Sequence, residues 1–328
     1  MTKTVLECNN LKTYFFTEAG IVKAVDDVSI RVKEGETVGV IGESGCGKSV
    51  TAMSFMRLVS TPPGKIVDGE ILFEGQDLLK IQDKEMRRLR GNDIAMIFQE
   101  PMSSLNPVLT IGEQIMEPLM EHQLLSKKEA RKTAIKLIEK VGIPRADEIV
   151  DAYPHELSGG MLQRIMIAIA LSCNPKMLIA DEPTTALDVT IQAQILDLLR
   201  KVKDEFQTSI LLITHDLGVV AEMADYVVVM YAGKVIEEAP VIDLFRKPKH
   251  PYTQGLMKSK PVINQRLERL YSIPGQVPNL LDLGDACHFS DRCESCMEIC
   301  RSKQPPLRES TDGHKVACWL YEEGVIHA

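Results

Sequence analysis

The sequence predicts an α/β domain with a parallel sheet, followed by a smaller cysteine-rich module. Short apolar runs alternate with helical patterns up to about residue 245, as in α/β domains. These runs are almost continuously apolar, which is typical of parallel strands buried on both faces. After residue 246 proline and cysteine become frequent and apolar periodicity weakens. We therefore expect two domains, residues 1–245 and residues 246–328.

Strands are expected at the main apolar runs, which are 37–42, 94–99, 176–181, 209–214 and 226–230. Helices separate them. Over 190–206 apolar residues recur at steps of three and four, which predicts an amphipathic helix. Ser126 and Glu129 form a capping box that starts another helix. Because no strand pattern occurs from about 100 to 175, we expect a helical subdomain to be inserted there.

Composition excludes several classes of function. The chain has 328 residues, with 38 Lys and Arg against 46 Asp and Glu, so its net charge is −8. Nucleic acid, a polyanion, is therefore not expected as a partner. No apolar run reaches the ~18–20 residues of a membrane span, and the first residues lack a secretory pattern. We expect the protein to remain on the cytoplasmic side of the membrane.

A glycine-rich loop follows the first predicted strand of the parallel sheet. It matches the motif G-x-x-x-x-G-K-[ST] through Gly42, Glu43, Ser44, Gly45, Cys46, Gly47, Lys48 and Ser49, with Val50 next. A strand before the motif and a helix after it are the context of a phosphate-binding loop, whose backbone N–H groups surround phosphate oxygens. Lys48 is expected to reach the β- and γ-phosphates and Ser49 to bind Mg²⁺.

Two carboxylates end the apolar run Met177–Asp181. In open α/β sheets ligands bind at the carboxyl ends of the strands, where Asp181 and Glu182 are expected. Asp181 fits the carboxylate that holds Mg²⁺ in phosphate-loop ATPases. Glu182 fits a base that polarises the attacking water. An Asp-Glu pair alone would indicate only a solvated turn.

A second candidate anion site begins at Ser158. Ser158 is a good N-cap, and Gly159 and Gly160 leave backbone N–H groups accessible at the start of an apolar helix. A single subunit has no evident use for two phosphate sites so far apart in sequence. In a dimer, the second site can close over the partner's γ-phosphate. A plain helix cap is the alternative.

The order of these motifs, with Gln99, Leu187-Asp188 and His215, resembles that of the ATP-binding subunits of ABC transporters. This resemblance implies a RecA-like phosphate-loop core, an antiparallel β subdomain and an inserted helical subdomain. It implies that Gln99 senses Mg²⁺ and the attacking water, that Asp188 acts across the dimer, and that His215 contacts the γ-phosphate. Phe15 resembles the aromatic residue that stacks on adenine, with Tyr14 as a neighbouring candidate.

The end of the chain resembles the C-terminal extension of dipeptide and oligopeptide importer ATPases. The residues that carry this resemblance are His250-Pro-Tyr-Thr253, Ile273-Pro-Gly275 and the cysteine run. It implies an ATPase subunit that pairs with an identical or a related ATPase, under two membrane-spanning permeases supplied by an extracytoplasmic peptide-binding protein. An importer of nickel or another small solute, and a soluble ABC ATPase of DNA repair or translation, are the alternatives.

Five of the eight cysteines lie in the last 42 residues. In a reducing compartment such a cluster indicates metal ligation, and four thiolates suit either zinc or a [4Fe–4S] cluster. Family resemblance selects Cys287, Cys293, Cys300 and Cys318, without Cys296, as ligands of [4Fe–4S], with zinc as the alternative.

Cys46 lies within the phosphate loop, beside a predicted helix N-terminus. Such a position lowers the pKa of a thiol. We therefore expect a reactive Cys46, whose alkylation blocks ATP binding and is prevented by bound ATP.

Overall fold

The computed structural model describes residues 3–185, 187–259, 271–281, 283–311 and 313–322. Its contacts divide the chain into two compact units. The first unit comprises Met1–Leu6, Val32–Thr37 and Leu72–Ile213. The second comprises Glu7–Arg31, Val38–Ile71 and Thr214–Ala328. Each unit contains both strands and helices, as an α/β fold requires.

Three buried parallel strands form the centre of the first unit. These are β6 (Ile94–Ile97), β7 (Met177–Asp181) and β8 (Ser209–Ile213). Ala180 of β7 is paired with Ile97 of β6 and with Leu212 of β8. The three strands predicted here are confirmed, each shorter by one or two residues.

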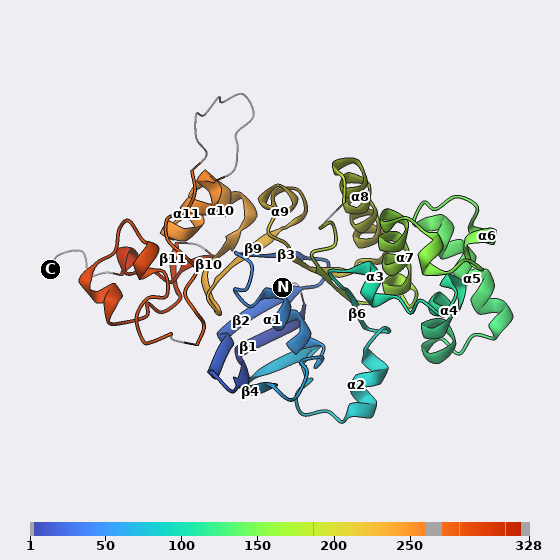
Figure 1. The fold of residues 1–328 in the computed structure, drawn as a ribbon, viewed down its shortest axis with the longest axis horizontal. Coiled ribbons are helices and arrows are strands. Elements are labelled where there is room, and N and C mark those ends of the chain that lie inside the picture. Colours follow the sequence, from blue (N-terminus) through green and yellow to red (C-terminus); the bar gives the residue numbers. More distant parts are fainter. Residues whose placement is uncertain (1–2, 186, 260–270, 282, 312, 323–328) are drawn as a thin grey trace. The chain divides into compact units, whose positions relative to one another are not determined.

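Helices make up most of the remaining first unit, and none of residues 98–176 forms a strand (Figure 1). Thr110 and Ser126 begin two of these helices with capping boxes, as predicted for Ser126. The elements are α2 (Asp83–Leu89), α3 (Pro101–Ser104), α4 (Ile111–His122), α5 (Lys127–Lys140), α6 (Ala146–Ile149), η1 (Pro154–Glu156), α7 (Gly159–Leu171) and α8 (Val189–Phe206).

The second unit holds the long strands of an antiparallel sheet. Neighbouring strands follow the order β2-β1-β4, with bounds β1 (Thr4–Thr17), β2 (Gly20–Lys33) and β4 (Gly64–Phe73). Only two residues connect β1 to β2, which makes that pair antiparallel. Within the first unit, Leu72 and Phe73 at the end of β4 pair antiparallel with β5 (Gln76–Asp77). The antiparallel β subdomain implied by the resemblance is therefore present.

Further strands of the second unit lie in the order β11-β12-β10-β9-β3. β3 pairs in parallel with β9, and the other neighbours are antiparallel. Their bounds are β3 (Thr37–Ile41), β9 (Tyr226–Tyr231), β10 (Lys234–Pro240), β11 (Arg308–Thr311) and β12 (His314–Val316). The helices of this unit are α1 (Lys48–Phe55), α9 (Leu217–Met223), α10 (Val241–Arg246), α11 (Pro251–Lys258), η2 (Ser290–Arg292), η3 (Glu298–Arg301) and η4 (Trp319–Tyr321).

The prediction of a separate loop-rich C-terminal module is not supported. Glu237 of β10 pairs with Val316 of β12, so the end of the chain extends the sheet that begins with β3. This pairing gives hydrogen-bond partners to an edge of β10. Strands of three and four residues carry too short a pattern to be recognised in the sequence.

The core of the second unit joins sheet and C-terminal residues through an aromatic cluster. Tyr231 of β9 and Tyr252 of α11 have ring centroids 4.7 Å apart. Phe289 packs edge-on against both, at 5.3 and 5.5 Å. All three side chains are buried, and Cys287 and Cys293 pack against the same core.

Among the described residues, no helix has both the length and the apolar character needed to cross a bilayer.

Candidate functional site

The glycine-rich loop lies between β3 and α1, where the motif predicted it. Gly47 is the N-cap of α1 and has a φ of 104°, which favours glycine. A Cβ atom at this position would lie 2.1 Å from the carbonyl oxygen of Ala24. No other residue fits there without moving the backbone.

Lys48 is buried and its ammonium group is held by the loop itself. Its Nζ donates to the carbonyl oxygens of Gly42, at 2.7 Å, and Glu43, at 3.1 Å. Ser44 and Gly45 are exposed, whereas Ser49 and Val50 are half-buried. The loop thus keeps a cation at its centre and presents its tip to solvent, an arrangement suited to phosphate.

The expectation of a reactive Cys46 is wrong in its premise. Cys46 is 1% exposed, and burial raises the pKa of its thiol even though Lys48 lies beside it. Desolvation of a thiolate outweighs the nearby positive charge. The thiol is therefore neutral at pH 7, and access to alkylating reagents requires the loop to open.

The carboxyl ends of β6 and β7 bring two predicted residues together in the first unit. Gln99 Nε2 donates to Glu182 Oε2 at 3.0 Å. Asp181, the last residue of β7, is buried. Glu182 has a φ of 48°, and its backbone N–H donates to the carbonyl oxygen of Ile213 at 2.8 Å. The carboxylate is thus presented by a backbone conformation that tertiary contacts enforce.

Thr185 is a residue of this site that sequence reasoning missed. Its Oγ1 donates to the same Glu182 Oε2 at 2.8 Å. With Gln99, it fixes the direction of the carboxylate. The spacing of three residues in Glu182-Pro-Thr-Thr185 could have indicated the contact, because a hydroxyl at that distance in a turn reaches back to the carboxylate.

The predicted second anion site lies at the N-terminus of α7. Ser158 caps this helix and accepts from the Met161 N–H at 3.4 Å. Nothing lies within 4 Å of a Cβ built on Gly159. At Gly160 a Cβ would lie 3.1 Å from Ile191 of α8, so this glycine permits close packing. Ser158 and Gly159, at the start of the helix, are exposed to solvent.

Asp188 is the N-cap of α8, where its carboxylate accepts from the Ile191 N–H at 2.9 Å. The residue is exposed. Capping is a local role that does not conflict with a role at a dimer interface.

His215 and Phe15 belong to the second unit. The Thr214 N–H donates to the Val40 carbonyl of β3 at 3.2 Å, which places exposed His215 just beyond the strand end. Phe15 is half-buried, and its ring lies 2.9 Å from a Cβ built on Gly64. Tyr14, the neighbouring candidate, donates its hydroxyl to Asp26 Oδ1 at 2.7 Å.

Two residues of the C-terminal region contact the phosphate loop, and neither was predicted to. Arg292 donates to both carboxylate oxygens of Glu43, at 2.6 and 3.1 Å. The hydroxyl of Tyr252 accepts from the Glu43 N–H at 2.8 Å. No local pattern could have indicated these contacts, because more than 200 residues separate the partners.

The four predicted cysteine ligands line one small cavity, together with Phe289 and Trp319. Cys296 is not among the lining residues. The cavity volume is about 10 Å³, room for about one water molecule. Within the described ranges, no three or more Cys, His, Asp or Glu side chains are arranged to hold a metal ion. The metal centre predicted at Cys287, Cys293, Cys300 and Cys318 is therefore not supported by this arrangement.

Burial raises the pKa of the Cys287 thiol to about 12 and that of Cys318 to about 11. In this arrangement both thiols are protonated at neutral pH. A metal would have to displace those protons on binding.

Comparisons with known proteins match these features. The family model "ABC transporter" matches residues 25–185, and "Oligopeptide/dipeptide transporter, C-terminal region" matches residues 236–300. The oligopeptide transport ATP-binding protein AppD of Bacillus subtilis is 56% identical over 98% of each chain. A putative peptide import ATP-binding protein of Brucella abortus is 51% identical over 97% of this chain and 98% of its own.

Among solved structures, the dimeric ATP-binding cassette MJ0796 in a post-hydrolysis state with ADP and Pi is similar, with a TM-score of 0.65 and 29% identity. The match covers 72% of this chain and 98% of that one. Fold, motifs and close relatives over the full length agree. This chain therefore belongs to the ATP-binding proteins of ABC transporters, in the group with an oligopeptide/dipeptide transporter C-terminal region.

Proposed function

We propose that this ATPase is the subunit that powers import of dipeptides or oligopeptides across the cytoplasmic membrane. The observation that carries the catalytic part is the contact of Gln99 with Glu182 at the carboxyl ends of β6 and β7. The peptide substrate is supported by the names of the close relatives and by the matched C-terminal region.

Each predicted residue has a role in this proposal. Lys48 binds the β- and γ-phosphates within the N–H groups of its loop, and Phe15 stacks on adenine. Glu182 accepts a proton from the attacking water, which Gln99 helps to orient, and His215 contacts the γ-phosphate.

The chain's oxygen donors also fit Mg²⁺, a cation that prefers oxygen ligands. Ser49 and Asp181, with Gln99, would hold it. When bound, the ion neutralises charge that develops on the phosphates.

We infer that the working form pairs two ATPase subunits. In that dimer Ser158, Gly159 and Gly160 of one subunit face the γ-phosphate bound by the other, and Asp188 acts across the interface. The dimeric state of the structural neighbour supports this arrangement. Two membrane-spanning permeases and an extracytoplasmic peptide-binding protein complete the importer, so the chain lies at the cytoplasmic face of the membrane.

The functions assigned to the two parts of the chain are likewise a proposal. Residues 1–245 act as the nucleotide-binding domain, with a helical subdomain at about 100–175. Residues 246–328 act as the extension typical of peptide importers.

The variant Glu182→Gln tests the catalytic role. It keeps the size of the side chain and removes the base, so ATP hydrolysis should fall about 10²–10⁴-fold while ATP binding is retained. Dimers closed on ATP should accumulate, as seen by size-exclusion chromatography. The exposed Glu139→Gln change on α5 is the matched control. Wild-type turnover by Glu182→Gln would exclude this role.

We also propose that the cysteines at the end of the chain bind a [4Fe–4S] cluster, with zinc as the alternative. The proposal rests on the spacing of Cys287, Cys293, Cys300 and Cys318 in the sequence. Because these thiols do not form a ligand group as they lie, no step of ATP hydrolysis is assigned to the cluster.

Metal and acid-labile sulfide are to be measured on protein purified without oxygen. Iron and sulfide near four per chain support the cluster. Both should be lost in Cys300→Ser and kept in Cys296→Ser. Zinc near one per chain would favour the alternative, and no metal would reject both.

A further inference from the structure

Glu43, the second residue of the phosphate loop, is held by the C-terminal region through both its backbone and its side chain. Its N–H donates to the Tyr252 hydroxyl at 2.8 Å. Its carboxylate accepts two hydrogen bonds from Arg292, at 2.6 and 3.1 Å. The loop that is expected to bind phosphates therefore takes part of its shape from residues more than 200 positions downstream.

Arg292 is buried, and its guanidinium group has several partners besides Glu43. Only 5% of its side chain is exposed. Its Nε donates to the Pro274 carbonyl at 3.0 Å and its NH1 to the Tyr231 hydroxyl at 3.3 Å. The guanidinium also lies over the Tyr231 ring, 5.8 Å from the centroid. A buried, bidentate and stacked guanidinium is not interchangeable with a lysine ammonium.

The charge of Glu43 gives this contact a consequence for nucleotide binding. A carboxylate inside a loop that binds phosphates repels its ligand unless the negative charge is neutralised. Arg292 supplies the neutralising charge. The Glu43 carbonyl also accepts from Lys48 Nζ at 3.1 Å, so the position of Glu43 is coupled to that of the phosphate-binding cation.

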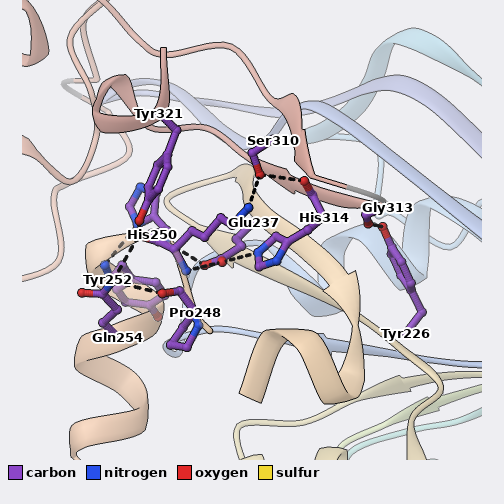
Figure 2. A network of polar contacts seen from close by, with 11 residues as sticks. Tyr226, Glu237, Pro248, His250, Tyr252, Gln254, Ser310, Gly313, His314 and Tyr321 are labelled. Carbon is purple, nitrogen blue, oxygen red and sulfur yellow. Dashed lines mark hydrogen bonds and ion pairs between the residues drawn. The ribbon is translucent and has the colours of Figure 1, made fainter. Parts of the chain in front are cut away.

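Tyr252 is fixed in turn by a buried polar network (Figure 2). The Glu237 carboxylate of β10, fully buried, accepts from the backbone N–H groups of Lys249, at 2.6 Å, and His250, at 3.0 Å. Its third partner is His314 Nε2 of β12, at 2.7 Å. His250 caps α11 and accepts from the Tyr252 N–H at 3.1 Å.

We propose that Arg292 and Tyr252 are positioning residues for ATP binding, which act through Glu43 to shape and neutralise the phosphate loop. The C-terminal region is then a structural part of the nucleotide site of its own subunit. This inference rests on the proposed role of residues 42–49 as the phosphate loop.

The test measures dissociation constants for a non-hydrolysable MgATP analogue, with KM and kcat for MgATP, on the full-length chain. Arg292→Met should raise Kd and KM about tenfold or more, because the Glu43 carboxylate is then unpaired beside the phosphates. Arg292→Lys should show a smaller increase. In Arg292→Met/Glu43→Gln the unpaired charge is gone, so most of the affinity should return.

Arg131→Met is the matched control, because Arg131 makes a similar bidentate pair with Asp151, at 2.7 and 2.6 Å, on an exposed surface. Its Kd should equal that of the wild type. If Arg292 had a purely structural role, Arg292→Met would lower the thermal stability of the protein without changing Kd. The second change, Glu43→Gln, would then not restore that stability. An unchanged Kd in Arg292→Met would overturn the proposal.

Two further variants keep the outcome clear. If Arg292→Met fails to fold, Tyr252→Phe serves instead. This change removes only the acceptor for the Glu43 N–H and should raise Kd about threefold. Wild-type affinity in Tyr252→Phe would then overturn the proposal.

Lys48→Ala tests the loop itself. If Lys48→Ala binds the analogue with the wild-type Kd, the proposed phosphate loop is rejected. If Lys48→Ala loses binding while Arg292→Met keeps the wild-type Kd, only the present inference is rejected.

Discussion

At the scale of single residues, Glu182 has a position and a direction that its neighbours determine. Its left-handed backbone conformation, with a φ of 48°, is held by the hydrogen bond from its N–H to Ile213. Gln99 and Thr185 both donate to the same carboxylate oxygen, Oε2. For Glu182 as the proposed base, a direction that is fixed before substrate arrives reduces the entropy lost during the reaction.

Thr185→Val therefore tests the orientation of this carboxylate. The change keeps the shape of the side chain and removes the hydroxyl that donates to Glu182. We expect kcat to fall about three- to tenfold with little change in KM, since ATP binding does not use this contact. Steady-state ATPase assays measure both constants. Thr190→Val, an exposed change in the first turn of α8, is the control, and an unaltered kcat in Thr185→Val contradicts the argument.

Cys46 gives a second prediction at this scale. The thiolate is the reactive form, and a raised pKa lowers its fraction at any pH below that value. Iodoacetamide should thus modify Cys46 at pH 7.5 at least about tenfold more slowly than free cysteine, and faster as pH rises. Peptide mass spectrometry gives the rate, with Cys46→Ala identifying the peptide. A rate above that of free cysteine would indicate a lowered pKa instead.

At the scale of elements, helix caps lie where the proposed function needs fixed helix ends. Ser158 begins α7 and Asp188 begins α8, and each side chain accepts from a backbone N–H of the first turn. Thr110 caps α4 in the same way, and this cap has no proposed role in ATP hydrolysis. Stability and catalysis are therefore separable by comparing caps.

Asp188→Ala should lower the free energy of unfolding by about 1 kcal/mol. Asp188→Ser should lower it by much less, because serine also caps helices. If Asp188 acts across a dimer, both variants should hydrolyse ATP more slowly. Thr110→Ala should lose a similar free energy without losing activity. Urea denaturation and ATPase assays provide the two readouts, and full activity in Asp188→Ser would leave Asp188 as a cap only.

At the scale of the whole molecule, the C-terminal residues belong to the core of the second unit. Phe289 packs between Tyr231 and Tyr252, and β12 pairs with β10. Phe289→Ala should therefore lower the free energy of unfolding by about 3 kcal/mol or more. Phe16→Ala, at a ring that is 48% exposed, should change it by less than about 0.5 kcal/mol. Equal effects in urea denaturation would show that Phe289 lies outside the core.

Much of the fold could be predicted because its patterns are local. The strands Met177–Asp181 and Ser209–Ile213 are continuous apolar runs, and the Ser126 capping box needs only four residues. The phosphate loop is recognisable for the same reason. The strands β11 and β12 were missed because they have only four and three residues, and because β10, the partner of β12, lies far away along the chain.

Five strands of the α/β fold, the helix that starts after Ser126, the helix over 190–206 and the glycine-rich loop could be predicted from the residues alone, as could the candidate residues Gln99, Asp181 and Glu182. These depend on residue types and on spacings of a few positions. The contacts of Arg292 and Tyr252 with Glu43, and the burial that outweighs the charge of Lys48 at Cys46, become evident only in the folded chain. Burial and long-range hydrogen bonds arise when segments hundreds of residues apart pack together, so no local pattern specifies them.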